Sequence, residues 1–150
     1  MARVKWLTSH AMPNVHHLTI TINRPPAEVY DFAADPRDLP QWAAGLARTS
    51  VDQVGDHWVV DAPFGKARIK FAERNSLGVL DHDVTFDDAL TGQIVTVHNP
   101  MRVLPHGAGS EFVFTLFRQP DMTDEQFAAD KAAVEKDLQT LKQLLESRPT

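Results

Sequence analysis

The chain has 150 residues, which is enough for one domain with a substantial core, and its 43% hydrophobic and 23% charged residues are typical of a soluble globular protein. A net charge of −5 argues against nucleic acid as a partner, since nucleic acids attract clustered Lys and Arg. The absence of cysteine excludes disulfides and thiolate catalysis.

No apolar run approaches the ~18 residues of a membrane span, and no apolar segment of a signal peptide follows residues 1–6. These features predict a cytoplasmic protein without membrane insertion. Residues 1–14 show no clear periodicity and are interpreted as an N-terminal extension. Residues 15–150 are interpreted as a single domain.

The first regular elements are a strand and two short helices. Residues 17–22 alternate between polar and apolar side chains, which predicts a strand with one buried face. Pro25 and Pro26 end that strand, and a short helix is expected over residues 27–34. Asp35 followed by Pro36 predicts the capped start of a second short helix, ending near residue 42.

From residue 46 onward the pattern changes to short apolar runs separated by turn residues. This predicts strands over residues 46–54, 58–62, 67–71, 79–86, 94–104 and 111–118. Pro100 interrupts the fifth of these runs, and proline inside a strand pattern often marks a bulge or an edge. Consecutive strands joined by tight turns favour an antiparallel sheet.

The last predicted element is one long helix over residues 123–147. Thr123 and Gln126 have the spacing of a capping box. One apolar stripe runs along the helix at helical spacing, through Phe127, Lys131, Val134, Leu138, Leu141 and Leu145. The helix is roughly 37 Å long, so it needs an extended surface to cover. The expected fold is therefore α+β, a curved antiparallel sheet of about seven strands around a long C-terminal helix.

The segment ITINRPPAEVYDFAADPRDLPQW, followed by the strands and the terminal helix, resembles the START/Bet v 1-like (SRPBCC) superfamily. The closer resemblance is to its bacterial polyketide cyclase/dehydrase-like subgroup, over about residues 15–147. The resemblance implies a helix-grip fold with a deep apolar cavity between sheet and helix. Members bind lipids, hormones, polyketides or other hydrophobic molecules, and some are cyclases. The superfamily has no universal catalytic motif, so the resemblance assigns no catalytic residue.

His82 lies between Asp81 and Asp83 in a predicted strand. Neighbours in a strand point to opposite faces, and His82 shares its face with the apolar Val84 and Phe86. His82 is therefore expected to point inward and both aspartates outward. Two interpretations remain open: a cavity histidine that bonds the ligand or acts as a general base, or a core histidine bonded to the backbone.

Lys131 and Asn99 also have alternative interpretations. Lys131 lies within the apolar stripe, so it either meets an acidic ligand head at the cavity mouth, acts as a desolvated catalytic amine, or extends to solvent. Asn99 shares its parity with Val95, Val97, Met101 and Val103 and is expected to face inward, as a ligand contact or as a structural amide. A bulge at Pro100 would instead turn His98 or Arg102 inward.

The residues expected to line the cavity combine these polar groups with aromatic and apolar side chains. They are Trp42, Trp58, Phe71, His82, Phe86, Asn99, Met101, Phe112, Phe114, Lys131 and Val134. The histidines show no metal-ligand spacing, and no phosphate loop or nucleophile motif is present, so no metal or cofactor is predicted.

The predicted function is binding of a small hydrophobic or amphipathic ligand in the cavity between sheet and helix. The alternative is a polyketide cyclase/aromatase-like or dehydratase-like enzyme acting on a hydrophobic substrate in the same cavity. The expected partner is a small hydrophobic molecule, and the protein is expected to be a monomer or a homodimer.

Overall fold

The structure, a computed structural model, describes residues 14–149. The predicted N-terminal extension therefore lies outside the described residues except for Asn14. In chain order the elements are β1 (Val15–Ile22), α1 (Pro26–Ala33), the 3-10 helix η2 (Pro36–Asp38), α2 (Leu39–Trp42), β2 (Val51–Val54), β3 (His57–Ala62), β4 (Gly65–Phe71), β5 (His82–Asp87), β6 (Ile94–Asn99), β7 (Met101–His106), β8 (Gly109–Phe117) and α3 (Asp124–Glu146).

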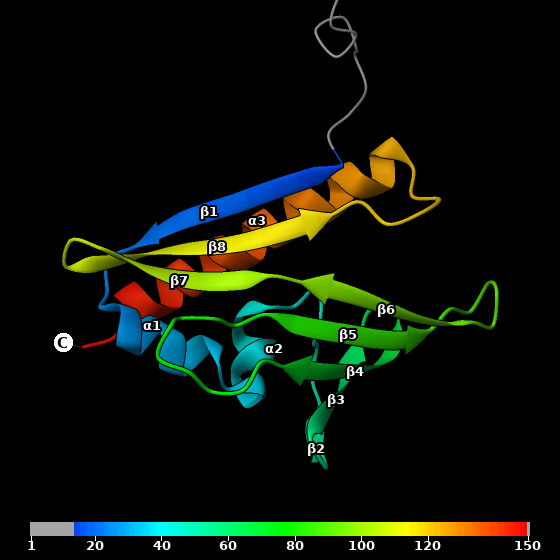
Figure 1. Cartoon of the computed structure of the whole chain (residues 1–150), viewed down its shortest axis with the longest axis horizontal. Coiled ribbons are helices and arrows are strands. Elements are labelled where there is room, and N and C mark those ends of the chain that lie inside the picture. Colours follow the sequence, from blue (N-terminus) through cyan, green and yellow to red (C-terminus); the bar gives the residue numbers. More distant parts are fainter. Residues whose placement is uncertain (1–13, 150) are drawn as a thin grey trace, which may run out of the picture.

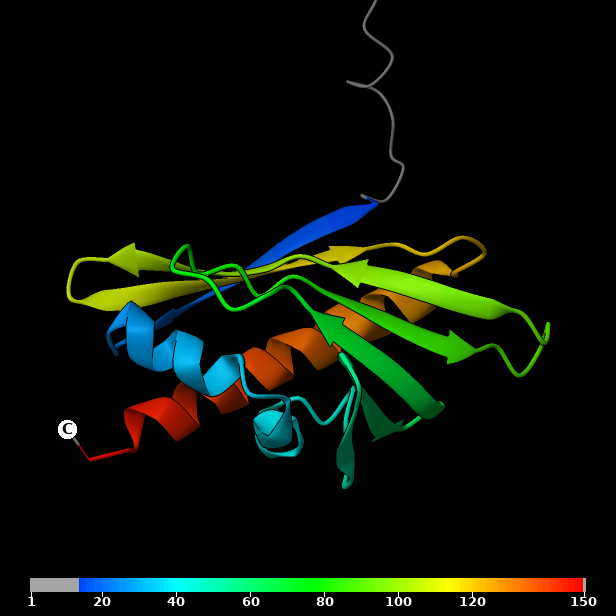
Figure 2. The same cartoon turned by 60° about the horizontal axis from the view of Figure 1, so that its bottom comes forward.

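The strands form two antiparallel sheets on one side of the helices (Figures 1 and 2). One sheet has the order β1-β8-β7 and the other the order β2-β3-β4-β5-β6. The expected α+β helix-grip fold is thus confirmed, with eight strands among the described residues in place of about seven. The first sheet joins the two ends of the domain, because Val15 pairs with Phe117 and Ile22 with Ser110.

Pro100 accounts for the additional strand. The run predicted as one interrupted strand is divided there into β6, which pairs with β5, and β7, which pairs with β8. Proline has no amide hydrogen to donate to a ladder, so the chain leaves one sheet at this residue and enters the other. The carbonyl oxygen of Pro100 accepts a hydrogen bond from the amide of Thr115, 2.9 Å away in β8.

Three predicted boundaries differ from the structure. The strand expected from residue 46 begins at Val51, because residues 44–50 form turns after α2. The strand expected from residue 79 begins at His82, and Val79 makes only an isolated bridge to Arg102. The helix expected from Pro36 starts as a 3-10 turn, and Asp35 caps it by accepting from the amide of Arg37.

The long helix α3 has the predicted N-terminus. The hydroxyl of Thr123 accepts from the amide of Gln126, and the Gln126 side chain accepts from the amide of Thr123. The helix runs beneath β1 and β8 (Figure 2) and buries Phe127, Leu138, Leu141 and Leu145 against them and the core. Among the described residues, no helix has both the length and the apolar character needed to cross a bilayer.

Candidate functional site

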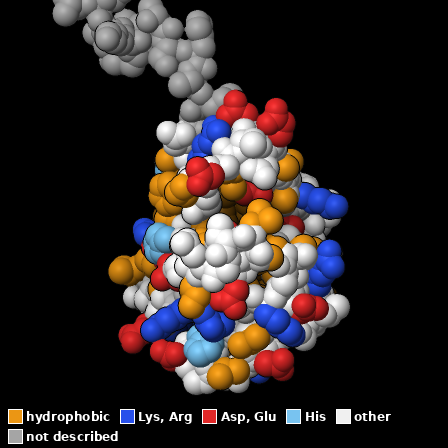
Figure 3. Space-filling model, turned by 90° about the vertical axis from the view of Figure 1, so that its right-hand side faces the viewer, with side chains coloured by type: hydrophobic (Ala, Val, Ile, Leu, Met, Phe, Trp, Pro, Cys, Tyr) orange, Lys and Arg blue, Asp and Glu red, His pale blue; other side chains and the backbone are white. Residues whose placement is uncertain are grey.

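A cavity of about 210 Å³, partly open to solvent, lies beneath the N-terminal half of α3, where the sheets diverge from the helix. Its helical wall and its connecting segments contribute Leu39, Trp42, Ala43, Gly45, Leu46, Phe64, Asp130, Ala133, Val134, Asp137 and Leu138. Its strand wall contributes His82, Asn99, Met101, Phe114 and Leu116. Figure 3 shows the end of the molecule that carries the β5–β6 loop, where hydrophobic side chains border a hollow.

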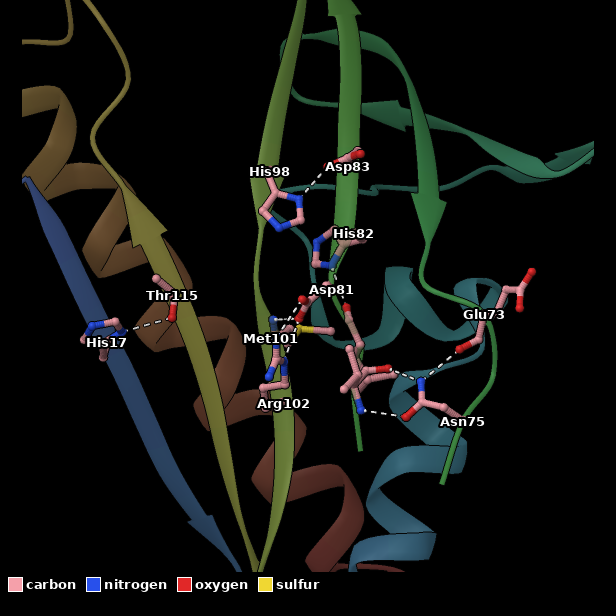
Figure 4. Close-up of polar contacts among 12 residues, drawn as sticks. His17, Glu73, Asn75, Asp81, His82, Asp83, His98, Met101, Arg102 and Thr115 are labelled. Atoms are coloured by element: carbon pink, nitrogen blue, oxygen red, sulfur yellow. Dashed lines mark hydrogen bonds and ion pairs between the residues drawn. The ribbon is translucent and has the colours of Figure 1, made fainter. Parts of the chain in front are cut away.

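His82 enters this cavity from β5. Alternation along the strand buries its side chain, which is 4% exposed, and turns Asp81 and Asp83 outward. The outward carboxylates are paired (Figure 4): Asp83 with His98 at 2.6 Å and Asp81 with Arg102 at 2.8 Å. His98 and Arg102 therefore point away from the cavity, and no bulge at Pro100 turns them inward.

The tautomer of His82 follows from its hydrogen bond. Nδ1 lies 3.0 Å from the carbonyl oxygen of Leu80, which can only accept, so Nδ1 carries the hydrogen. Burial lowers the pKa of His82, because the charged ring would lose its hydration. The ring is neutral, and its Nε2 has no hydrogen-bond partner among residues 14–149. Nε2 is thus a free acceptor.

Asn99 lies beside His82 because the two residues are register partners across β5 and β6. Met101, on the other side of Pro100, also lines the cavity although it belongs to the other sheet. The corner at Pro100 therefore brings residues of both sheets to one cavity wall. The ring of Phe114, from β8, lies with its centroid 6.2 Å from that of His82.

The helical wall carries two carboxyl groups. Asp130 and Asp137 lie four residues before and three residues after Val134, so all three face the same side of α3. Burial raises the pKa of Asp130, and it raises the pKa of Asp137 to about 6, although the amide of Gly45 and the charge of Lys136 act in the opposite direction. Neither carboxylate forms a salt bridge with a described residue.

Trp42, the last residue of α2, lines the cavity. Its ring meets that of Phe112 edge to face, with centroids 6.1 Å apart. Its Nε1 is enclosed and has no hydrogen-bond partner within the described part of the chain. Trp42 therefore contributes carbon atoms rather than its N–H group to the cavity wall, which suits an apolar group.

Six of the eleven expected residues line the cavity: Trp42, His82, Asn99, Met101, Phe114 and Val134. Two more lie directly behind it, since Phe71 packs on His82 with centroids 4.9 Å apart and Phe112 supports Trp42. Phe86 packs on Phe64, which is itself in the lining. Trp58, half-buried in β3, is paired with Ile69 and is outside the lining.

Lys131 is also outside the lining, and it is the one ionisable residue among the five expected residues that are. Its side chain is 42% exposed and its Nζ lies 3.8 Å from a carboxylate oxygen of Glu135. The helix phase puts Lys131 at the edge of the buried stripe, so it extends to solvent. Asp130 and Asp137 were not predicted as cavity residues, because acidic side chains are common on the exposed face of a helix. Their spacing from Val134 was the signal that could have revealed them.

A second, more open hollow of about 620 Å³ lies between α1 and the segment that precedes β5. Its polar groups already bond to one another. Arg74 pairs with Asp31, and the Asn75 side chain bonds the backbone of Leu77 and Val79. The Asn75 side chain also donates to the carbonyl of Glu73 (Figure 4). Among residues 14–149, no three His, Asp or Glu side chains are grouped to hold a metal ion. The first cavity is therefore the candidate site.

Residues 16–146 match the family described as polyketide cyclase / dehydrase and lipid transport. The chain belongs to this family. Membership in this SRPBCC-type family confirms the superfamily expected from the sequence. The family description suggests a general class of role, hydrophobic-ligand binding or cyclase-like activity. No curated protein matches the chain.

Several solved structures share the fold of this family member. Protein MLL2253 from Mesorhizobium loti aligns with a TM-score of 0.70 at 14% identity, over 91% of this chain and 99% of that one. DynU16, a protein in the dynemicin biosynthetic locus, aligns with a TM-score of 0.68 at 16% identity, over 91% of this chain and 48% of that one. The Aha1 dimer from Colwellia psychrerythraea aligns with a TM-score of 0.65 at 16% identity, over 89% and 96%. Identities this low establish the fold alone.

Proposed function

We propose that this protein binds a small hydrophobic or amphipathic molecule in the cavity between the sheets and α3. The observation that carries the proposal is the cavity itself, about 210 Å³ in volume and lined mostly by apolar side chains. A few convergent polar groups within an apolar wall are the usual composition of a small-molecule site. Family membership supports the same class of function.

The test compares two tryptophan substitutions on α3. Val134→Trp fills the cavity, since Val134 lies in its wall, whereas Ala132→Trp adds the same side chain on the exposed face of the helix. Native mass spectrometry of the protein purified from its host should show a bound apolar molecule with the wild type and with Ala132→Trp. Val134→Trp should be empty. An unliganded wild type, or a ligand retained by Val134→Trp, would count against the proposal.

A second candidate is a cyclase- or dehydratase-like enzyme in the same cavity. It is favoured by the presence in one lining of a neutral His82, a potential proton acceptor, and of Asp137, whose pKa of about 6 suits a general acid. Of the groups that the sequence offered for this role, His82 and Asn99 line the cavity, whereas Lys131 lies outside it. Turnover of a hydrophobic polyketide analogue that is lost in both His82→Gln and Asp137→Asn, with binding retained, would support this role.

A further inference from the structure

The charged groups in the cavity wall all have the same sign. Asp130 and Asp137 line the cavity, and no Lys or Arg lines it among the described residues. Lys131, at the edge of the same helix face, is directed toward Glu135 at the surface. Inside the cavity, an acidic headgroup such as that of a fatty acid would therefore meet carboxylates, since Lys136 lines only the outer hollow beside Asp137.

The strand wall adds a hydrogen-bond acceptor. The buried His82 has Nδ1–H committed to the carbonyl of Leu80, and its Nε2 presents an unpartnered lone pair. Among the described residues, Nε2 is not one of the enclosed atoms that lack a partner, so a donor in the cavity, from water or a ligand, can reach it. This observation is independent of the two aspartates. Like carboxylates, which only accept hydrogen bonds, it favours a ligand that donates them.

Asp137 lies at the rim of the cavity, where the polar headgroup of such a ligand would be placed. Together with Trp42, Gly45 and Ala133, it borders both the cavity and an outer hollow of about 290 Å³ between α2 and α3. A charged headgroup at this rim would stay partly hydrated while its apolar part filled the cavity. Lys136 lines the outer hollow and its charge acts on Asp137, but the half-buried carboxylate forms no salt bridge among residues 14–149 and would gain a close partner.

We infer that the ligand is an apolar amine whose ammonium group pairs with Asp137 and donates hydrogen bonds, and that amphiphiles with a carboxylate head are excluded. This inference rests on the proposed function, because it assigns the ligand class of the same cavity. The aromatic wall of Trp42 and Phe114 would hold the apolar part. Asp130, two helical turns from Asp137, adds to the negative potential at the mouth.

The experiment uses three probes with one alkyl chain and different heads: octylamine, 1-octanol and octanoate. Isothermal titration calorimetry of the full chain at pH 7.5 should give the order octylamine, octanol, octanoate, with at least tenfold between the first and the last. Asp137→Asn should reduce octylamine affinity about tenfold and leave octanol unchanged. The matched control Asp52→Asn, an exposed aspartate on β2, should change neither.

The octanol measurement separates this inference from the proposed function. If octanol binds but octylamine binds no more tightly, or if octanoate binds as tightly as octylamine, the cavity holds apolar ligands and the amine assignment is wrong. An unchanged octylamine affinity in Asp137→Asn would also overturn it. If none of the three probes binds, both the amine assignment and the ligand-binding function fail. Circular dichroism of each variant checks that it is folded.

Discussion

The guanidinium Nε of Arg24, just after β1, donates a hydrogen bond of 3.0 Å to the carbonyl oxygen of Leu145 in the last turn of α3. The Nη2 group of the same side chain donates to the carbonyls of Glu146 and Arg148. Arg24 is 8% exposed, so these bonds are largely shielded from water. One cation thus satisfies carbonyl groups that the end of a helix leaves without intrahelical partners.

We expect Arg24→Ala to lower the free energy of unfolding by about 2–4 kcal/mol, because charge-assisted bonds are lost and buried carbonyls are left unpaired. Urea denaturation followed by circular dichroism measures this change. Arg37→Ala is the control, since Arg37 pairs with Asp35 but its side chain is 73% exposed. Removing that exposed pair should change the free energy of unfolding far less than Arg24→Ala does. Equal effects of the two substitutions would contradict the assignment.

Thr123→Ala should lower the free energy of unfolding by about 1 kcal/mol, because it removes the capping hydroxyl from the Gln126 amide. Thr140→Ala on the same helix provides the comparison. The Thr140 hydroxyl donates only to the carbonyl of Lys136, one turn back, which adds little to helix stability. The same denaturation experiment distinguishes them, and a Thr140 effect as large as that of Thr123 would be inconsistent with the cap.

Asp137→Asn should stabilise the protein at pH 8 and change little at pH 4. The folded-state pKa of about 6 lies above the ordinary value of 3.8, so the contribution of Asp137 is fully present below pH 3.8 and is lost as pH rises through 6. Allowing for solvent screening, the gain at pH 8 is about 1–2 kcal/mol. Stability curves at several pH values test this, and a destabilised variant at pH 8 would refute it.

His82 should remain neutral, with hydrogen on Nδ1, at pH values where exposed histidines are already charged. Its pKa is lowered from 6.5 chiefly by burial, so its contribution to stability is present above pH 6.5 and is lost as pH falls through the folded-state pKa. Nitrogen-15 NMR of the imidazole ring reports both tautomer and titration. A midpoint at or above 6.5, or a protonated Nε2, would disprove the assignment.

The fold was largely predictable, because its signals are local. The capping box of Thr123, the turn prolines and the alternation that buries His82 each act within a few residues. The contents of the site were less predictable, because they depend on which segments meet. The burial of Asp137 depends on the turn after α2, whose Gly45 amide reaches its carboxylate. Likewise, the proline at position 100 indicated a break but not that the chain changes sheets there.

The pairing of β1 with β8 has a consequence for the order in which the protein forms. The strands of the five-stranded sheet follow one another as hairpins, so each can pair soon after it is made. β1 is made first, yet its partner ends at Phe117 and α3 follows later still. During synthesis, β1 therefore stays unpaired until about a hundred further residues have been made and β8 can hydrogen-bond to it.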